Sequence, residues 1–266
     1  MKWEHIRPGE FEKALEECAY TCIVPIGALE PHGYHLPVGT DYFAAKANAE
    51  AAAEIEPCMV FPAMFLGSVY ESMAMKGTIT LPVDTLFRLY FDIFDEIARN
   101  GFKKILIYSG HGGNMDFLRE IVLASVHKRK PYTLFLCTTL TGLCSPEDKK
   151  MMAEDCEGRR WGHGCEWETS VIMHLAGEDV DLSMVADEVI QHPAAPENLH
   201  SRVFTAVDWF AKTPMYYVGN PRKATAERGK RYSEHAAQNL AEIIKSVKEN
   251  TSVEQRTEEY YKLMGR

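Results

Sequence analysis

Short apolar segments with the residue pattern of β-strands alternate along this chain with amphipathic helical patterns. The predicted strands cover residues 21–26, 104–108 and 132–138, and the predicted helices cover residues 42–54, 82–100, 115–128 and 225–249. Glycine stands where the first two strands end, at Gly27 and Gly110. Such alternation is typical of a mainly parallel sheet covered by helices, so the sequence predicts an α/β fold.

Size and composition agree with one large α/β domain over residues 1–266, whose tail at 251–266 is either a peripheral helix or loose. The chain is 46% hydrophobic and 25% charged, and its net charge of −9 gives no reason to expect nucleic acid or a membrane as a partner. The N-terminus begins with charged residues, and the seven cysteines are scattered without a C-x-x-C pair. We therefore expect a cytoplasmic protein with reduced thiols.

The most informative stretch for chemistry runs from Glu30 to Asp41, after the first predicted strand. Residues two apart on an extended segment point the same way, so Glu30 and His32 could meet a metal pair from one side. Singly, both also fit a solvated loop. Asp41 precedes a predicted helix, where an aspartate can also serve only as an N-cap. Two carboxylates and the imidazoles of His32 and His35 gathered here favour a metal site.

A second informative stretch, residues 109–114 (SGHGGN), lies between a predicted strand and a predicted helix. Three glycines around His111 allow backbone to approach a bound group and to adopt positive φ, which a purely structural histidine would not require. A dinucleotide motif would need glycine in place of Met115, and a nucleophile elbow would need glycine in place of Ile107. The sequence therefore argues against a Rossmann site and a serine hydrolase.

A third stretch, residues 163–170 (HGCEWETS), adds His163, Glu166 and Glu168 before an apolar run. Either glutamate alone also fits a first-turn acid favoured by the helix dipole. Cys165 is a nucleophile by residue type, but a small buried filler is the simpler interpretation.

Together the three stretches resemble the motifs of the creatininase (creatinine amidohydrolase) family. That family carries E-x-H-G-x-H-L-P with an aspartate shortly after, then N-G-H-x-x-N, then H-[AG]-G-x-x-E-T-S. Here the motifs stand as residues 30–37 with Asp41, as 109–114 and as 163–170, and Gly77-Thr78-Ile79 resembles a further G-T-I element. The chain is identified on this basis as a GHGGN-type member that differs from creatininase itself.

The resemblance implies a three-layer α/β/α sandwich with two divalent metal ions at the C-terminal edge of the sheet. Carried over position by position, Glu30 and His111 hold one ion, His32 holds the other, and Asp41 bridges them. The metals implied are Zn²⁺, Mn²⁺ or Fe²⁺, which suit a mixed set of carboxylates and imidazoles, and the sequence does not choose between them.

The last metal ligand is less directly implied. Creatininase takes a further carboxylate two residues after the histidine of its second motif, where this chain has Gly113. Relatives with the GHGGN form carry a glutamate three residues after the histidine of the third motif, which predicts Glu166 as the ligand. Glu168 is then the alternative, and His35 and Asn114 are secondary candidates at the same centre.

The activity implied by the resemblance is hydrolysis at a carbonyl. Two cations sharing Asp41 would lower the pKa of a bridging water and polarise a carbonyl, so hydroxide attack needs no serine or cysteine. His163 is expected to act as acid/base or leaving-group donor, beside Glu166. The expected reaction is C–N hydrolysis of a small cyclic amide or lactam. A C–C hydrolase opening an oxidised inositol ring (3-dehydro-scyllo-inosose type) and a silent metal- or metabolite-binding paralogue are the alternatives.

Substrate contacts and partners follow from the same resemblance. Creatininase has a tryptophan and an acid just before the histidine of its third motif, where this chain has Arg159 and Gly162, which argues against creatinine as substrate. Arg159, Trp167 and Thr78 are candidates for substrate contact. Arg159 and Arg160 fit an anionic substrate, but an exposed arginine pair near Glu157 is the simpler interpretation. The expected partner is a small-molecule substrate, and the family's hexamers imply a homo-oligomer.

Two segments can be interpreted either as parts of a pocket or as parts of a subunit contact. Residues 65–80, which are rich in glycine and methionine, form either a lid or pocket wall or a gap-filling subunit contact. Residues 191–221 carry Trp209, Phe210, Tyr216 and Tyr217, and these aromatic side chains line a pocket or seal a subunit interface.

Overall fold

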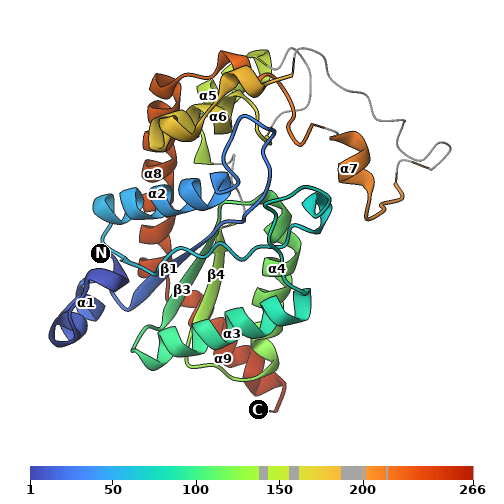
Figure 1. The fold of residues 1–266 in the computed structure, drawn as a ribbon. Helices are drawn as coiled ribbons and strands as arrows, with labels where there is room; N and C mark the ends of the chain where they lie inside the picture. The colour runs from blue at the N-terminus through green and yellow to red at the C-terminus, as the bar shows by residue number, and fades with distance from the viewer. Residues whose placement is uncertain (138–142, 156–161, 187–199, 201, 214, 266) are drawn as a thin grey trace.

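A parallel sheet forms the centre of the molecule (Figure 1). The computed structural model describes residues 1–265 apart from 138–142, 156–161, 187–199, 201 and 214. Its strands are β1 (Thr21–Ile26), β2 (Met59–Val60), β3 (Lys104–Ser109) and β4 (Thr133–Cys137), arranged in the order β2-β1-β3-β4. Ile26 of β1 pairs with Ser109 of β3, so the chain leaves both strands at the same sheet edge.

Helices cover the sheet and extend beyond its carboxyl edge. They are α1 (Phe11–Glu17), α2 (Thr40–Ile55), α3 (Val83–Arg99), α4 (Met115–Ala124), α5 (Pro146–Asp155), α6 (Glu166–Leu175), α7 (Asp208–Lys212), α8 (Ala226–Glu249) and α9 (Ser252–Leu263). The predicted elements are all present, with ends shifted by a few residues; α4 ends at Ala124 and continues as a 3₁₀ turn, Ser125–His127. The tail forms helix α9, whose buried Tyr261 donates a hydrogen bond to the carbonyl of Lys128.

The two faces of the sheet pack against different helices, which confirms the predicted three-layer α/β/α class. Val24 and Ile26 of β1 belong to the core shared with α3 and α4, whereas Ile23 points to the core shared with α2 and α8. Helix α2 contributes small residues to its core, Ala45, Ala49, Ala52 and Ala53. Full burial of one isoleucine or leucine stabilises a fold by roughly 1.5–3 kcal/mol. Each core buries several such side chains, so the two cores together hold the strands, and the sheet edge that carries the site, in place.

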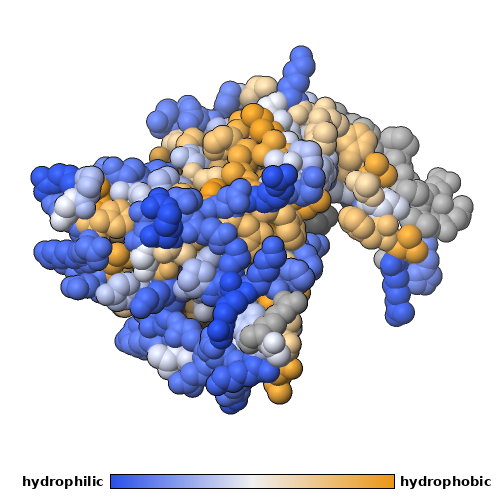
Figure 2. Space-filling view, turned by 90° about the horizontal axis from the view of Figure 1, so that it is seen from below, coloured by the Kyte–Doolittle hydropathy of each residue, from blue (hydrophilic) through white to orange (hydrophobic). Residues whose placement is uncertain are grey.

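The segment around α7 projects beside the carboxyl edge of the sheet (Figure 1). In Figure 2 the surface is largely hydrophilic, with hydrophobic side chains near the centre of the view and on this projecting segment. Phe204 and Val207 are among its exposed residues. None of the helices in the described part of the chain is long and apolar enough to cross a membrane.

Candidate metal centre

Glycines at the ends of β1 and β3 bring helix α2 against the sheet edge. A Cβ on Gly27 would lie 2.5 Å from the Cα of Tyr42, and a Cβ on Gly110 would lie 2.5 Å from the carbonyl oxygen of Asp41. Real side chains do not approach backbone so closely, so only glycine permits this packing. The approach places Asp41, in the first turn of α2, directly over the ends of both strands.

Glu30, His32, Asp41 and His111 meet at this edge and are at most 5% exposed. The Nδ1 atom of His111 lies 3.1 Å from Glu30 Oε2 and 2.9 Å from Asp41 Oδ2. The Nε2 atom of His32 lies 3.2 Å from Asp41 Oδ1. The two oxygens of Asp41 therefore face two different imidazoles. Helix α2 begins at Thr40 after Gly39, so Asp41 is not its N-cap, the simpler interpretation of this residue.

Backbone carbonyls orient both imidazoles. Nδ1 of His32 lies 3.1 Å from the carbonyl of Glu30, and Nε2 of His111 lies 3.1 Å from the carbonyl of Ser68. Because a carbonyl only accepts hydrogen bonds, these nitrogens carry the proton in the neutral rings, and the lone pairs on the other nitrogens face Asp41. Residues 30–32 belong to the connection between β1 and α2 and to neither a helix nor a strand.

Charges within the cluster shift its pKa values strongly. Burial alone would lower the pKa of His32, but Asp41, Glu168 and Glu30 outweigh it and raise that pKa to about 10. Against burial, the carboxylates of Glu30 and Asp41 raise the pKa of His111 well above its usual value. Burial opposes ionisation of Glu30, yet the nearby histidines lower its pKa to about 2, and they also lower the pKa of Asp41. Without a metal, the cluster consists of imidazolium–carboxylate pairs.

The donor atoms fit divalent metal ions. Glu30 Oε2, His32 Nε2 and Asp41 Oδ2 are buried, and although each lies near an atom of opposite charge, none makes a hydrogen bond of normal geometry with the described residues. Buried polar atoms are normally satisfied, so three such atoms in one cluster indicate a bound group. Each of three residue sets brings its donor atoms within 4.8 Å of one another: Glu30, His32 and His163; Glu30, Glu71 and His111; and His32, Asp41 and Glu168.

Glu168, and not Glu166, faces the cluster. Glu168 Oε2 lies 3.5 Å from His32 Nε2, and burial raises the pKa of this carboxyl to about 7, against the opposing effect of His32. Glu166 accepts hydrogen bonds from Ser170 Oγ at 2.8 Å and Tyr232 OH at 3.1 Å, and its Oε1 lies 3.2 Å from Arg228. The expectation that Glu166 is the last ligand and acts beside His163 does not agree with this placement. Residues two apart on a helix are rotated by roughly 200°, so the two side chains of α6 point to opposite sides.

His163 lies beside the cluster with one nitrogen fixed. Its Nε2 lies 3.1 Å from the carbonyl of Pro31, to which it donates, and its Nδ1 lies 3.9 Å from Glu30 Oε2. The ring stacks on His32 at a centroid distance of 4.0 Å and meets the edge of Trp209 at 4.9 Å. Burial, together with the charge of His32, lowers the pKa of His163 to about 4. His163 is thus a neutral imidazole at neutral pH, with a free lone pair beside the cluster.

A cavity of about 560 Å³ lies over the cluster. Besides the cluster residues it is lined by Tyr70 and Glu71 from the 3₁₀ helix η3 (Tyr70–Ser72), by Asp116 of α4, and by Phe204 and Trp209. These contacts support the pocket-wall interpretation of residues 65–80 and the pocket interpretation of Trp209. No sequence motif singled out Glu71, although residues 65–80, which contain it, were a candidate pocket wall.

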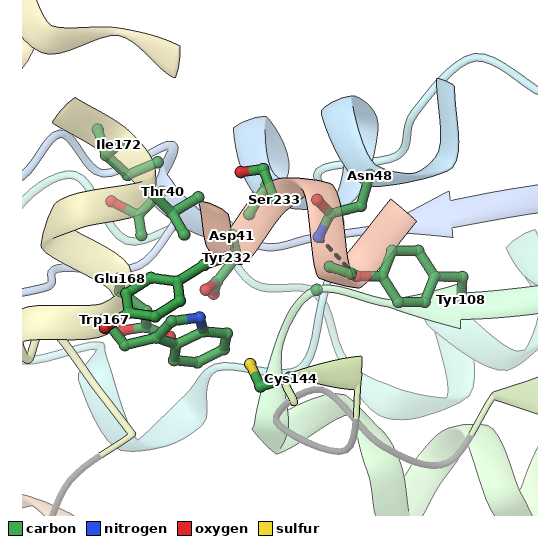
Figure 3. A pocket seen from close by; sticks show the side chains of 14 residues that line it. Thr40, Asp41, Asn48, Tyr108, Cys144, Trp167, Glu168, Ile172, Tyr232 and Ser233 are labelled. Atoms are coloured by element: carbon green, nitrogen blue, oxygen red, sulfur yellow. Dashed lines mark hydrogen bonds between the residues drawn. The ribbon is translucent and has the colours of Figure 1, made fainter. Parts of the chain in front are cut away.

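A second cavity of about 30 Å³ lies on the inner side of Asp41 and Glu168 (Figure 3). Thr40, Trp167, Tyr232 and Ser233 line it, and Asn48 donates a hydrogen bond to Tyr108 OH at its edge. This volume accommodates about one water molecule and no substrate. Trp167, a predicted substrate contact, therefore lines this small cavity and is not among the described residues that line the larger one.

Other residues predicted at the site make hydrogen bonds outside the cluster of proposed ligands. Asn114 accepts a hydrogen bond from the backbone of Ser68 and donates to Gly27 and Ser109, which ties η3's segment to both strand ends. His35 pairs with Thr169 Oγ1 at 3.1 Å, and burial lowers its pKa to about 4. Thr78 donates to the carbonyl of Ser72 and is not among the described residues that line the larger cavity. Arg159 lies outside the described residues.

Comparison with known proteins agrees with this site. The family model for creatininase, described as creatinine amidohydrolase, matches residues 4–244. The creatinine amidohydrolase of Pseudomonas putida is 27% identical over 256 residues, which cover 89% of this chain and 93% of that protein. The mycofactocin precursor peptide peptidase of Mycolicibacterium smegmatis is 26% identical over 230 residues, covering 84% and 83%. A 3-dehydro-scyllo-inosose hydrolase of Thermotoga maritima is 27% identical over 120 residues, covering 45% and 37%.

Solved structures show the same fold. A crystal structure of creatinine amidohydrolase (creatininase) superposes with a TM-score of 0.78 at 23% identity, covering 94% of this chain and 98% of the other. Creatininase structures of similar likeness include a Zn–Zn form of a mutant and a Mn form. The family model matches most of the chain, the three motifs occur in the order expected for the family, and the fold is shared. The chain therefore belongs to the creatininase family of metal-dependent amidohydrolases.

Proposed function

We propose that this protein hydrolyses a C–N amide bond of a small cyclic substrate with the help of two divalent metal ions. The observation that carries the proposal is Asp41, whose two oxygens face the lone-pair nitrogens of His111 and His32. Glu30 and His111 would hold one ion, and His32 with Glu168 would hold the other. Asp41 would be shared. Glu168 takes the place that the sequence assigned to Glu166.

The metal ions and His163 would have different roles in the reaction. Two such ions lower the pKa of a water molecule and polarise a substrate carbonyl. His163 accepts a proton at Nδ1, because its Nε2 is committed to the carbonyl of Pro31. It then delivers this proton, taken from the attacking water, to the leaving nitrogen as the C–N bond breaks, so the ring-opened product carries a carboxylate and an amine. The cavity of about 560 Å³ has room for a small substrate above these groups.

C–C hydrolysis of an oxidised inositol ring is the second candidate. It is supported by the partial match to the inosose hydrolase of Thermotoga maritima. The same metal ligands and His163 could serve this reaction, with carbon in place of nitrogen as the atom that receives the proton. A silent binding paralogue is less well supported, since a cavity of this size opens directly onto His163 and the cluster.

Metal content tests the proposal and separates the two glutamates. Wild type, Glu168→Gln and Glu166→Gln should be purified without chelator or metal-affinity resin, reloaded with Mn²⁺ or Zn²⁺, and measured by plasma mass spectrometry. We expect about two ions per chain in wild type and Glu166→Gln, and about one in Glu168→Gln. Glu166→Gln is the matched control, since it removes the same charge from the same turn of α6 and keeps an amide oxygen that can accept the hydrogen bonds of Ser170 and Tyr232. One ion or fewer in wild type would refute a two-metal centre.

Activity is tested on cyclic amides and keto-inositols with the loaded protein. C–N cleavage releases a titratable amine together with a carboxylate, whereas C–C cleavage releases a carboxylate alone. His163→Ala should retain both ions and lose at least about 100-fold in turnover, the usual contribution of a general acid–base group. Full activity of that variant would contradict the role given to His163.

A further inference from the structure

Glu71 is an acidic side chain that the proposed chemistry does not use, although it lies in the wall of the catalytic cavity. Its segment is anchored to the metal cluster on both sides. The carbonyl of Ser68 accepts the Nε2 proton of His111, and Ser72 Oγ donates to Glu30 Oε1 at 2.6 Å. The backbone of Ser68 also donates to Asn114 at 2.9 Å. Glu71 therefore projects from a segment whose position is fixed relative to the metal ligands.

The absence of a side chain at Gly113 makes room for Glu71. A Cβ at that position would lie 2.8 Å from Glu71 Oε1 and 2.5 Å from His111 Nε2. Even alanine would therefore displace one of these side chains. The glycine-rich turn thus serves two purposes, because it admits His111 to the cluster and leaves space for a carboxylate beside it.

Glu71 lies on the side of His111 that faces away from the shared aspartate. Its Oε1 is 4.0 Å from Nε2 of His111, whereas Nδ1 is the nitrogen that faces Asp41. Nε2 is already committed to the carbonyl of Ser68, so it offers no lone pair for an ion between His111 and Glu71. With 26% of its side chain exposed, Glu71 is available to a molecule in the cavity.

The charge of the cavity wall is one-sided. Among the described residues that line it are five carboxylates and neither lysine nor arginine. Glu30, Asp41 and Glu168 belong to the proposed ligand set, where two divalent ions would offset their charge. Asp116 is exposed and screened by water, which leaves Glu71 as the strongest unbalanced charge among the described residues that line the cavity. Aromatic side chains of Tyr70, Phe204 and Trp209 lie on the same wall and suit a cation.

We propose that Glu71 is a specificity-determining residue that selects amides bearing a positively charged amino or guanidino group a few bonds from the scissile carbonyl. The inference rests on the proposed hydrolase and names its substrate class. A carboxylate oxygen of Glu71 lies within 4.8 Å of a carboxylate oxygen of Glu30, which is a proposed metal ligand. A substrate whose carbonyl lies at the metals would therefore place a cationic group a few bonds away against Glu71. Its carboxylate then accepts a charge-assisted hydrogen bond that a neutral substrate cannot make.

Three hydroxamates test this selection by binding, without knowledge of the substrate. Glycine hydroxamate carries an ammonium group, propionohydroxamate is its neutral isostere, and malonic monohydroxamate carries a carboxylate. Each should be titrated calorimetrically into Mn²⁺-loaded wild type, Glu71→Gln and Asp116→Asn. We expect wild type to bind glycine hydroxamate about tenfold tighter than propionohydroxamate, and Glu71→Gln to bring this ratio to about one. Asp116→Asn removes an exposed carboxylate from the same wall and should retain most of the ratio.

The outcomes separate this inference from the proposed function. Metal-dependent binding of propionohydroxamate to Glu71→Gln shows that the variant is folded and its metal centre intact. Equal ratios in wild type and Glu71→Gln, or a wild-type preference for the anionic probe, would overturn the inference alone. Failure of all three probes to bind any loaded protein would overturn the proposed metal centre and this inference with it.

Discussion

Metal binding to this centre should release protons, because the ligands carry them when no metal is bound. The neighbouring carboxylates outweigh burial and raise the pKa of His32 to about 10, and they raise the pKa of His111 well above its usual value. Both imidazoles are therefore protonated at pH 7, and each must lose its proton before it can donate a lone pair. The affinity for Mn²⁺ should consequently rise with pH.

The size of the effect follows from the same pKa values. A pKa of about 10 for His32 means that removing its proton at pH 7 costs roughly 4 kcal/mol of binding free energy, at about 1.4 kcal/mol per pH unit. Each ion that displaces one proton should gain about tenfold in affinity per pH unit between pH 6 and 8. Glu168, whose burial raises its pKa to about 7, adds a further partial proton at the lower end of this range.

Calorimetric titration of Mn²⁺ into chelator-treated protein measures the effect directly. The titration is repeated at one pH in two buffers with different ionisation enthalpies, and the difference in heat gives the number of protons released. We expect about two at pH 7 for the two ions together, and about one fewer in His32→Gln. His35→Gln is a matched control, since burial lowers the pKa of His35 to about 4 and this residue carries no proton to displace. Affinity independent of pH, with no proton release, would refute the imidazolium–carboxylate account of the cluster.

Two further predictions concern stability. The raised pKa values of His32 and His111 stabilise the metal-free fold. This stabilisation is complete below the unfolded-state pKa of about 6.5 and is lost as the pH rises towards 10. The Tm of chelator-treated protein should therefore fall from pH 6.5 to 9, and a Tm that rises over this range would contradict the prediction. Gly229→Ala in α8 should destabilise the protein by about 2–4 kcal/mol in urea unfolding, despite alanine's better helix propensity, because its Cβ would lie 1.8 Å from the carbonyl oxygen of Ser170. Gly177→Ala, whose Cβ meets nothing within 4 Å, is the control and should leave the free energy of unfolding nearly unchanged.

The elements of the fold could be predicted because their signals are local. Strand β3 is a continuous apolar run that ends in a glycine turn, and the repeat of Leu86, Tyr90, Phe94 and Ile97 marks the buried face of α3. The cluster of Glu30, His32, Asp41 and His111 could also be proposed, since parallel strands end at one sheet edge and the residues that follow them must meet there.

The choice between Glu166 and Glu168 could not be made from the sequence, because both are acids in the first turn of α6 and the sequence does not show how this helix is rotated. Two partners of Glu166, Arg228 and Tyr232, lie more than 60 residues further along the chain. A pattern around residue 166 contains no information about where α8 will lie. The same holds for Glu71, whose role depends on the space at Gly113 and not on its neighbours in sequence.

Helix α8 therefore takes part in building the proposed metal centre, although none of its residues is among the proposed ligands. Arg228 and Tyr232 hold Glu166 on one side of α6, and Gly229 lets the backbone of α8 touch α6 at Ser170. Since α6 is rigid, fixing Glu166 on the α8 side sets the rotation of the helix and turns Glu168 towards His32. Glu166 is on this argument a positioning residue, which explains why a second buried glutamate stands in the same turn as the proposed ligand.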